Sequence, residues 1–291
     1  MKTSAMKTSA VLVLPAVVIL GAFFVVPLIW VVILSFLGAG PTGEVQHAFT
    51  LGNYARFLTD SYYVNDLLLR TIRLAAIATL FSVVIGYLGA FVIVRASPTA
   101  QTWMILLVML PLWVNLVVRT LSLMVVLGRN GLVNQILVGV GITARPLPLL
   151  YNETAVVIGM VQVAVPFVVM SVYGVLQAIP RQLEQAAMTV GATPLSAFRR
   201  VTLPLSVPGI LAGSVLAFGI NVESFVVPIL LGGGRVRFMS VAAYETATVS
   251  NNLPFAATIG VILLIVTMVM LGVYQWAVRS AGRPATAVQA A

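Results

Sequence analysis

Six long apolar stretches alternate with short polar ones along the chain, and each is long enough to cross a membrane as a helix. A hydrocarbon core about 30 Å thick takes roughly 20 helical residues at about 1.5 Å per residue. The stretches that qualify cover approximately residues 11–37, 67–94, 102–127, 154–178, 208–231 and 255–278. This pattern predicts an all-α integral membrane protein with six transmembrane helices, and it places the tails 1–10 and 279–291 on one side. The polar stretch 38–66 is expected to be a loop with a short amphipathic helix near Tyr54 to Leu58.

Composition strengthens this interpretation. Hydrophobic residues make up 60% of the 291 and charged residues only 8%, whereas soluble domains carry about 25% charged residues. The net charge of +9 suggests an acidic partner, but the sixteen Lys and Arg are scattered singly or in pairs and form no basic stripe. We therefore expect the lipid bilayer as a partner and no nucleic acid.

Residue counts exclude several kinds of chemistry. The chain has no Cys and a single His, His47, so thiol nucleophiles, zinc clusters and Ser-His-Asp triads are not expected. A phosphate-binding Walker A loop needs Lys after Gly, and the only lysines, Lys2 and Lys7, do not follow Gly. The sequence predicts no catalytic residue, no metal site and no enzyme.

Charge does not decide the orientation in the membrane. The predicted side of the termini holds eight Lys and Arg, the opposite loops and helix ends hold seven, and Arg119 lies within a span, sixteen in all. Because orientation follows Lys and Arg in short loops, this difference is too small to choose a side.

The polar stretch 179–206, between the fourth and fifth spans, has a helical pattern of its own. Leu183, Ala186 and Ala187 recur at i, i+3 and i+4, which gives one helix face that is small and apolar. Gly191 interrupts this helix, and Ala192-Thr193-Pro194 offers a new cap and first turn. A second helix is predicted by apolar residues at three-residue spacing: Leu195, Phe198 and Val201. The stretch therefore predicts two short helices joined at a glycine hinge.

This stretch resembles the EAA loop of ABC-importer permeases, in which an EAA triplet is followed by Gly and later by Leu-Pro or Ile-Pro. Ala186, Ala187, Gly191, Phe198 and the pair Leu203-Pro204 fit that pattern. The first triplet position departs from it, because Gln185 stands where the family has an acid and Glu184 comes just before. Further stretches that look like permeases of the spermidine/putrescine type are Pro111 to Trp113, Arg119-Thr120, GRNGLVNQIL, Pro166-Phe167, Pro208-Gly209 and FVVPILLGGG at 225–234.

The resemblance implies a type I importer fold in the bacterial inner membrane, with both termini cytoplasmic and 179–206 acting as a cytoplasmic coupling helix. It implies four partners: a second permease subunit, two ATPase subunits that bind ATP and Mg²⁺, and an extracytoplasmic solute-binding protein; no cofactor is expected in this chain. The residues that it assigns to ATPase coupling are Glu184, Gln185, Ala186, Ala187, Gly191, Phe198, Arg199, Leu203 and Pro204. The implied solute is a polyamine, and similar permeases serve iron, thiamine, phosphonates, opines and amino-acid derivatives.

Two charged residues within predicted spans are candidates for the solute pathway, because charges in lipid are costly and usually face a cavity or a partner. Arg119 lies about 25 Å along the third span and Glu223 about 22 Å along the fifth. Glu223, with Asn221 beside it, either lines the cavity and attracts a cationic amine, pairs with Arg119, or lies in a loop. Arg119 alternatively snorkels outward.

Four further residues are weaker candidates. Trp113 is expected to mark a bend beside Pro111, and Asn115 to make a hydrogen bond between helices or to line the pathway. Tyr244 and Glu245 are expected at an outer gate, at a binding-protein contact, or on a solvated face.

Two competing classes of function stay open at this level. A membrane-embedded enzyme would need a catalytic cluster, which the Cys and His counts mostly remove. A secondary transporter would use an ion gradient in place of ATP, and it commonly shows inverted repeats with broken helices. No repeat is visible between the two halves of this sequence.

Overall fold

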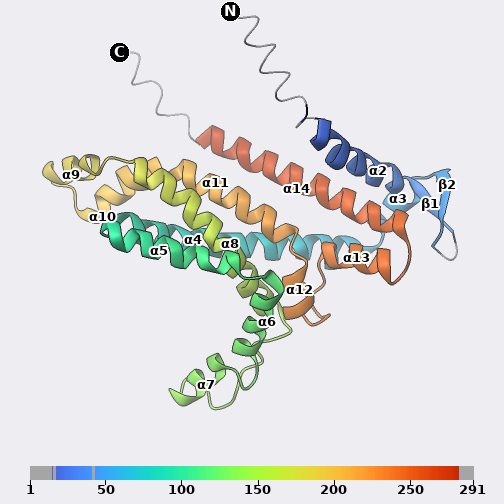
Figure 1. Cartoon of the computed structure of the whole chain (residues 1–291), viewed down its shortest axis with the longest axis horizontal. Helices are drawn as coiled ribbons and strands as arrows, with labels where there is room; N and C mark the ends of the chain where they lie inside the picture. The colour runs from blue at the N-terminus through green and yellow to red at the C-terminus, as the bar shows by residue number, and fades with distance from the viewer. Residues whose placement is uncertain (1–14, 16–17, 41–42, 282–291) are drawn as a thin grey trace, which may run out of the picture. The chain divides into compact units, whose positions relative to one another are not determined.

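The computed structural model describes residue 15 and residues 18–40 and 43–281 of the chain. These residues are mainly helical (Figure 1). The elements in chain order are η1 (Gly21–Val25), α2 (Val26–Ser35), β1 (Leu37–Ala39), β2 (Val45–Phe49), α3 (Gly52–Thr59), η2 (Tyr62–Leu69), α4 (Arg70–Arg95), α5 (Pro98–Trp113), α6 (Leu116–Leu127), α7 (Leu132–Gly139), α8 (Glu153–Ala178), α9 (Arg181–Thr189), α10 (Pro194–Ala197), η3 (Phe198–Thr202), α11 (Leu203–Val222), α12 (Val226–Leu231), α13 (Met239–Thr248) and α14 (Leu253–Ala281).

Among the residues that the structure describes, six segments are long and apolar enough to cross a membrane, which confirms the predicted number. They are Val18–Ser35, Tyr62–Arg95, Leu116–Gly139, Glu153–Ala178, Pro194–Val222 and Leu253–Tyr274, and Pro98–Trp113 is a shorter apolar helix. The chain divides into two compact units, 1–65 with 242–266 and 66–241 with 267–291.

The first unit contains a small aromatic core. Phe57 of α3 is fully buried and stacks on Tyr63, with ring centroids 5.5 Å apart. Tyr63 meets Phe255 edge to face at 5.1 Å, and the Arg56 guanidinium lies 4.5 Å from the same ring. These contacts place the predicted amphipathic helix, observed as α3, with its aromatic face inward. The antiparallel pair β1–β2 precedes α3 in the chain.

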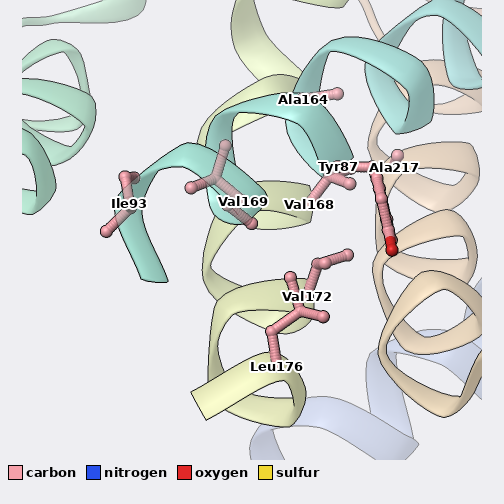
Figure 2. Packing of buried hydrophobic residues seen from close by; sticks show 9 residues of the cluster. Tyr87, Ile93, Ala164, Val168, Val169, Val172, Leu176 and Ala217 are labelled. Atoms are coloured by element: carbon pink, nitrogen blue, oxygen red, sulfur yellow. The ribbon is translucent and has the colours of Figure 1, made fainter. Parts of the chain in front are cut away.

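Helices α4, α8 and α11 pack on one another and form the core of the second unit. Figure 2 shows the buried cluster between them, with Tyr87 and Ile93 from α4, Val168 and Val172 from α8, and Ala217 from α11. The helices approach closely because their contact positions are small side chains.

Glycines set that spacing. A Cβ added at Gly86 of α4 would lie 2.7 Å from the Val168 side chain, and one at Gly213 of α11 would lie 3.2 Å from the Val168 backbone. A Cβ at Gly209 would lie 3.0 Å from Val175. The Gly209 and Gly213 pair therefore packs α11 against α8, as small residues four apart do between membrane helices.

The third predicted span, 102–127, is not one helix. It is divided into α5 and α6 with a break at Val114, which is extended, and Asn115, which is not helical. The break has a local cause, because Pro111 weakens the end of α5. Asn115 then caps α6 by accepting a hydrogen bond from the Val117 N–H at 2.8 Å.

The fifth predicted span, 208–231, also differs from the structure. Helical conformation runs without interruption from Pro194 through α10, η3 and α11 to Val222. The chain then turns before the short α12, so 223–225 lie between helices. Pro208 does not stop α11, although it stands inside the helix.

Candidate functional site

Helix α9 carries the predicted EAA-like triplet and lies with α10 at one end of the α4–α8–α11 core (Figure 1). None of the nine described residues of α9 is buried. Leu183 and Met188 are 44% and 40% exposed, and Ala186 is exposed as well. The small apolar face predicted from the sequence is therefore left open by this chain.

The joint after α9 is a glycine hinge. Gly191 has φ +93°, a left-handed conformation that costs other residues about 1–2 kcal/mol. Thr193 then caps the next helix by accepting from the Ser196 N–H at 3.3 Å, and Pro194 occupies the first turn. These contacts confirm the first short helix, the hinge and the cap that the sequence predicts. The second helix is not short, because it continues through η3 and α11 to Val222.

The remaining coupling candidates fall into exposed and inward groups. Gln185, Arg199 and Pro204 are exposed, and Ala187 is half-buried. Phe198 and Leu203 pack against the buried cluster of the core. The structure thus brings the predicted set to one end of the molecule's second unit, with Phe198 facing inward.

Glu184 also turns inward, and its carboxylate joins two other elements. The Arg95 Nη2 atom, at the end of α4, lies 2.8 Å from Oε1 and 2.7 Å from Oε2. Thr202 Oγ1, at the end of η3, donates to Oε1. The Glu184 side chain is only 21% exposed, whereas that of Arg95 is 48% exposed. Sequence analysis missed Arg95 and Thr202, which lie 89 and 18 residues from Glu184.

A second arginine also connects α9 to α4. Arg181, the first residue of α9, donates from Nη2 to the Val94 carbonyl oxygen of α4 at 2.6 Å. We call Arg95, Arg181, Glu184 and Thr202 the α4–α9 clasp. A cavity of about 250 Å³ lies beside it, lined by these four residues, by Gln185, and by apolar residues of α4, α8, α9 and the link between α8 and α9.

An aromatic group continues from the clasp into the core. The Arg95 guanidinium lies 4.0 Å from the Phe91 ring centroid. Phe91 meets Phe198 edge to face at 5.2 Å, and Phe198 meets Tyr87 at 6.1 Å. Ser206 Oγ of α11 donates to the Tyr87 hydroxyl at 3.2 Å. The contacts therefore run from α9 through α4 and η3 to α11.

Glu223 and Asn221, the leading pathway candidates, lie at the opposite end of α11 and face different surroundings. Glu223 is the C-terminal cap residue of α11 and is exposed, so it stands at a helix end and not within a span. Asn221 is 1% exposed, and its Nδ2 donates to Thr79 Oγ1 of α4 at 3.2 Å. Its Oδ1 is buried and finds no partner among the described residues.

Arg119 neither pairs with Glu223 among the described residues nor snorkels outward. Arg119 is only 9% exposed, and its Nη1 atom donates to the Pro111 carbonyl oxygen at 3.0 Å. Nε is buried without a partner among the described atoms. The side chain therefore folds back across the α5–α6 break, where it shares the Pro111 carbonyl oxygen with the Val114 N–H.

The other four candidates are exposed. Trp113 is 76% exposed at the end of α5, and Asn115 is the exposed cap of α6. Tyr244 and Glu245 are exposed on α13, which belongs largely to the first unit. Roles for these four residues in solute passage or gating stay predictions.

Comparison with known proteins adds to this geometry. A family model described as binding-protein-dependent transport system inner membrane component matches residues 82–283. The spermidine/putrescine transport system permease proteins PotB of Haemophilus influenzae and Escherichia coli are 30% and 31% identical over 252 residues. Those matches cover 87% of this chain, and 87% and 91% of the two relatives.

A solved structure shares the fold. The bacterial alginate ABC transporter, in complex with an alginate pentasaccharide-bound periplasmic protein, matches with a TM-score of 0.79 at 18% identity, over 97% of both chains. The type I importer fold expected from the EAA-like loop is thereby confirmed. The chain belongs to the family of binding-protein-dependent transport system inner membrane components, as a multi-pass permease of an ABC importer.

Proposed function

We propose that this chain forms half of an ATP-driven import pathway for a polyamine such as spermidine or putrescine. In this proposal, a second permease completes the pathway, two separate ATPase subunits bind ATP and Mg²⁺, and an extracytoplasmic protein delivers the solute. Both termini and the loop 179–206 lie in the cytoplasm.

The open face of α9 is the observation that carries the coupling part. A helix with no buried residue among its nine, an exposed small apolar face and a defined hinge suits insertion into a groove on another protein. The ATPase is that protein in this proposal. Rocking of the ATPases would then displace α9 and the helices attached to it.

The polyamine part is supported by the identity of about 30% to two polyamine permeases across most of both chains. Glu223 gives this part a chemical rationale, because an exposed carboxylate at the end of α11 can attract a cationic amine. Asn221, two residues earlier, carries a buried carbonyl oxygen that finds no partner in the described chain.

Reconstitution tests both parts. The chain is co-expressed with the second permease and the ATPase subunits proposed as its partners, purified, and inserted into liposomes with ATP inside. We expect ATPase subunits to co-purify, and labelled spermidine or putrescine to accumulate only when ATP and the binding protein are both present. Accumulation by the chain alone under an ion gradient would contradict the ATP-driven mechanism. ATP-dependent uptake of only a different solute would contradict the polyamine assignment.

A further inference from the structure

Apolar burial does not fix the position of α9, because none of its nine described residues is buried. Polar contacts fix it instead. Glu184 binds Arg95 and Thr202, and Arg181 binds the Val94 carbonyl. The clasp thus attaches an otherwise exposed helix to α4.

The two arginine contacts are reciprocal and agree with the helix dipoles. Arg95 ends α4 and reaches a carboxylate in the first turn of α9, whereas Arg181 begins α9 and reaches a carbonyl in the last turn of α4. A carboxylate is favoured at a helix N-terminus and a cation at a C-terminus. Each contact is also charge-assisted, which makes it shorter and stronger than a neutral hydrogen bond.

Three routes lead from α9 to the core. One covalent route runs back through Ile179 and Pro180 to α8, and the other runs forward through Gly191, a hinge with open space around it. The third route passes through the clasp to α4, which packs against both α8 and α11. Neither covalent route leads directly to α4, so the clasp is the contact that ties the motion of α9 to α4.

We propose that Arg95 is a positioning residue for coupling: it holds α9 to α4 so that both move together when an ATPase displaces α9. This inference rests on the proposed function of the chain. The stacking of Arg95 on Phe91, and of Phe91 on Phe198, extends the same attachment to η3 and the start of α11. In this arrangement the motion of α9 reaches α4 through the clasp and reaches α11 through the aromatic contacts.

Substitution of Arg95 in the full transporter complex tests the proposal. Arg95→Ala removes the pair, and we expect the ATPase subunits still to co-purify, because the open face of α9 is unchanged. Loss of a charge-assisted contact predicts that uptake, and the ratio of ATP hydrolysis with loaded binding protein to hydrolysis without it, fall about tenfold or more. Arg95→Lys should recover part of both. Arg129→Ala, which removes an exposed arginine of the α6–α7 turn, is the matched control and should behave as wild type.

Exchanging the two charges tests whether the Arg95–Glu184 ion pair is the contact that couples α9 to α4. Arg95→Glu and Glu184→Arg should each lower the hydrolysis ratio, and the double variant should recover it at least in part, because the ion pair is restored with reversed sense. A double variant that assembles but recovers nothing would overturn the role of the pair.

A distance measurement separates positioning from mere stabilisation. The chain has no Cys, so spin labels can be attached at Val92→Cys on α4 and Val190→Cys after α9, which are 53% and 85% exposed. With Arg95 present, the label distance should stay constant between nucleotide-free and ATP-bound complexes, whereas with Arg95→Ala it should change. A nucleotide-dependent distance with Arg95 present would overturn the proposal.

The outcomes also separate this inference from the proposed function. If the wild-type complex shows no ATP-dependent uptake stimulated by a binding protein, the proposed function fails. If the wild type shows it and Arg95→Ala matches the wild type in the hydrolysis ratio, only the positioning role of Arg95 fails.

Discussion

Gly191 illustrates how one residue's backbone limits what the α9–α10 joint accepts. Its φ is +93°, yet an added Cβ would meet no described atom within 4 Å. The constraint is therefore conformational and not steric. A residue with a side chain would pull the joint out of the left-handed region and change the angle between α9 and α10.

We expect Gly191→Val to insert into the membrane normally and to reduce ATP-dependent uptake strongly, because the strain of about 1–2 kcal/mol is relieved by moving an exposed helix. Uptake per inserted molecule is the measurement. Gly174→Ala is the matched control, since Gly174 lies inside α8 with no described atom near its Cβ position, and there Ala should stabilise the helix by about 0.5–1 kcal/mol. Full ATP-dependent uptake by Gly191→Val would remove the hinge from the mechanism.

Asn221 is a residue whose burial is not fully compensated. Its Nδ2 donates to Thr79, but its buried Oδ1 has no partner in the described chain. Thr79 Oγ1 donates elsewhere, to the Ala75 carbonyl oxygen at 2.7 Å. A buried unsatisfied acceptor costs roughly 1–3 kcal/mol, and such costs are commonly kept where function needs them.

Asn221→Leu, of similar size, should therefore raise the melting temperature of the purified complex and lower uptake. Thermal unfolding and uptake are measured on the same preparation. Thr79→Val is the companion variant, because it removes the accepting hydroxyl and leaves the Asn221 amide in place. A stabilised variant with undiminished uptake would show that Asn221 has no role in the pathway.

Glu223, at the other end of α11, allows the proposed attraction of a cationic amine to be tested. Glu223→Gln keeps the shape of an exposed side chain and removes its charge. If the carboxylate attracts a cationic amine, the polyamine concentration for half-maximal uptake should rise, with a smaller effect at high salt, because screening already weakens the attraction. Glu245→Gln, on α13, is the comparison. Identical uptake curves for Glu223→Gln and wild type at low salt would contradict the attraction.

At the scale of elements, the α8–α11 contact depends on residues too small to separate the helices. A Cβ at Gly213 would lie 3.2 Å from the Val168 Cα atom, whereas a Cβ at Gly219, on the same helix, would meet no described atom within 4 Å. Both glycines therefore lie in α11, but only Gly213 packs closely against another helix.

Gly213→Leu should destabilise the protein by about 1–3 kcal/mol, the usual cost of overpacking, and Gly219→Leu should not destabilise it. Unfolding of the solubilised protein, followed by tryptophan fluorescence, gives both values. Equal stability of the two variants would mean that α11 does not pack on α8 through Gly213.

The elements also show what a sequence can predict here. Six spans follow from hydropathy, and the α9 and α10 helices follow from apolar spacing together with Gly191 and Thr193. A window of about 20 residues averages over a single-residue break, so the Asn115 cap that divides the third span is lost in it. The same averaging hides the end of α11 at Val222, which moves Glu223 from a span to a helix end.

The α4–α9 clasp could not be predicted from the sequence for a different reason. Arg95 and Glu184 meet only because α4 and α8 pack side by side and bring residues 89 apart to one end of the core. Arg119 is similar, because its bond to the Pro111 carbonyl exists only once the helix is broken between them. Local patterns predict elements, whereas these contacts require their arrangement.

At the scale of the whole molecule, the direction of α8 decides which loops share a side of the membrane. Its 26 residues span about 39 Å, more than the hydrocarbon core of about 30 Å. The loop 140–152 directly precedes α8 and the joint after α9 follows it, so these two segments must face opposite compartments if α8 crosses the bilayer. Coupling to a cytoplasmic ATPase requires the joint after α9 to be the inner one.

Because the native chain has no Cys, single cysteines can report this directly. Val190→Cys lies after α9 at a position 85% exposed, and Ala144→Cys lies at an exposed position of the loop before α8. A membrane-impermeant maleimide should label position 144 in intact spheroplasts and position 190 only in inverted vesicles. The Cys-free chain is the background control, and each variant is also labelled after detergent lysis to show that its thiol reacts. Labelling of position 190 from outside would place α9 out of contact with a cytoplasmic ATPase. That result would contradict both the coupling role of α9 and the positioning role of the clasp.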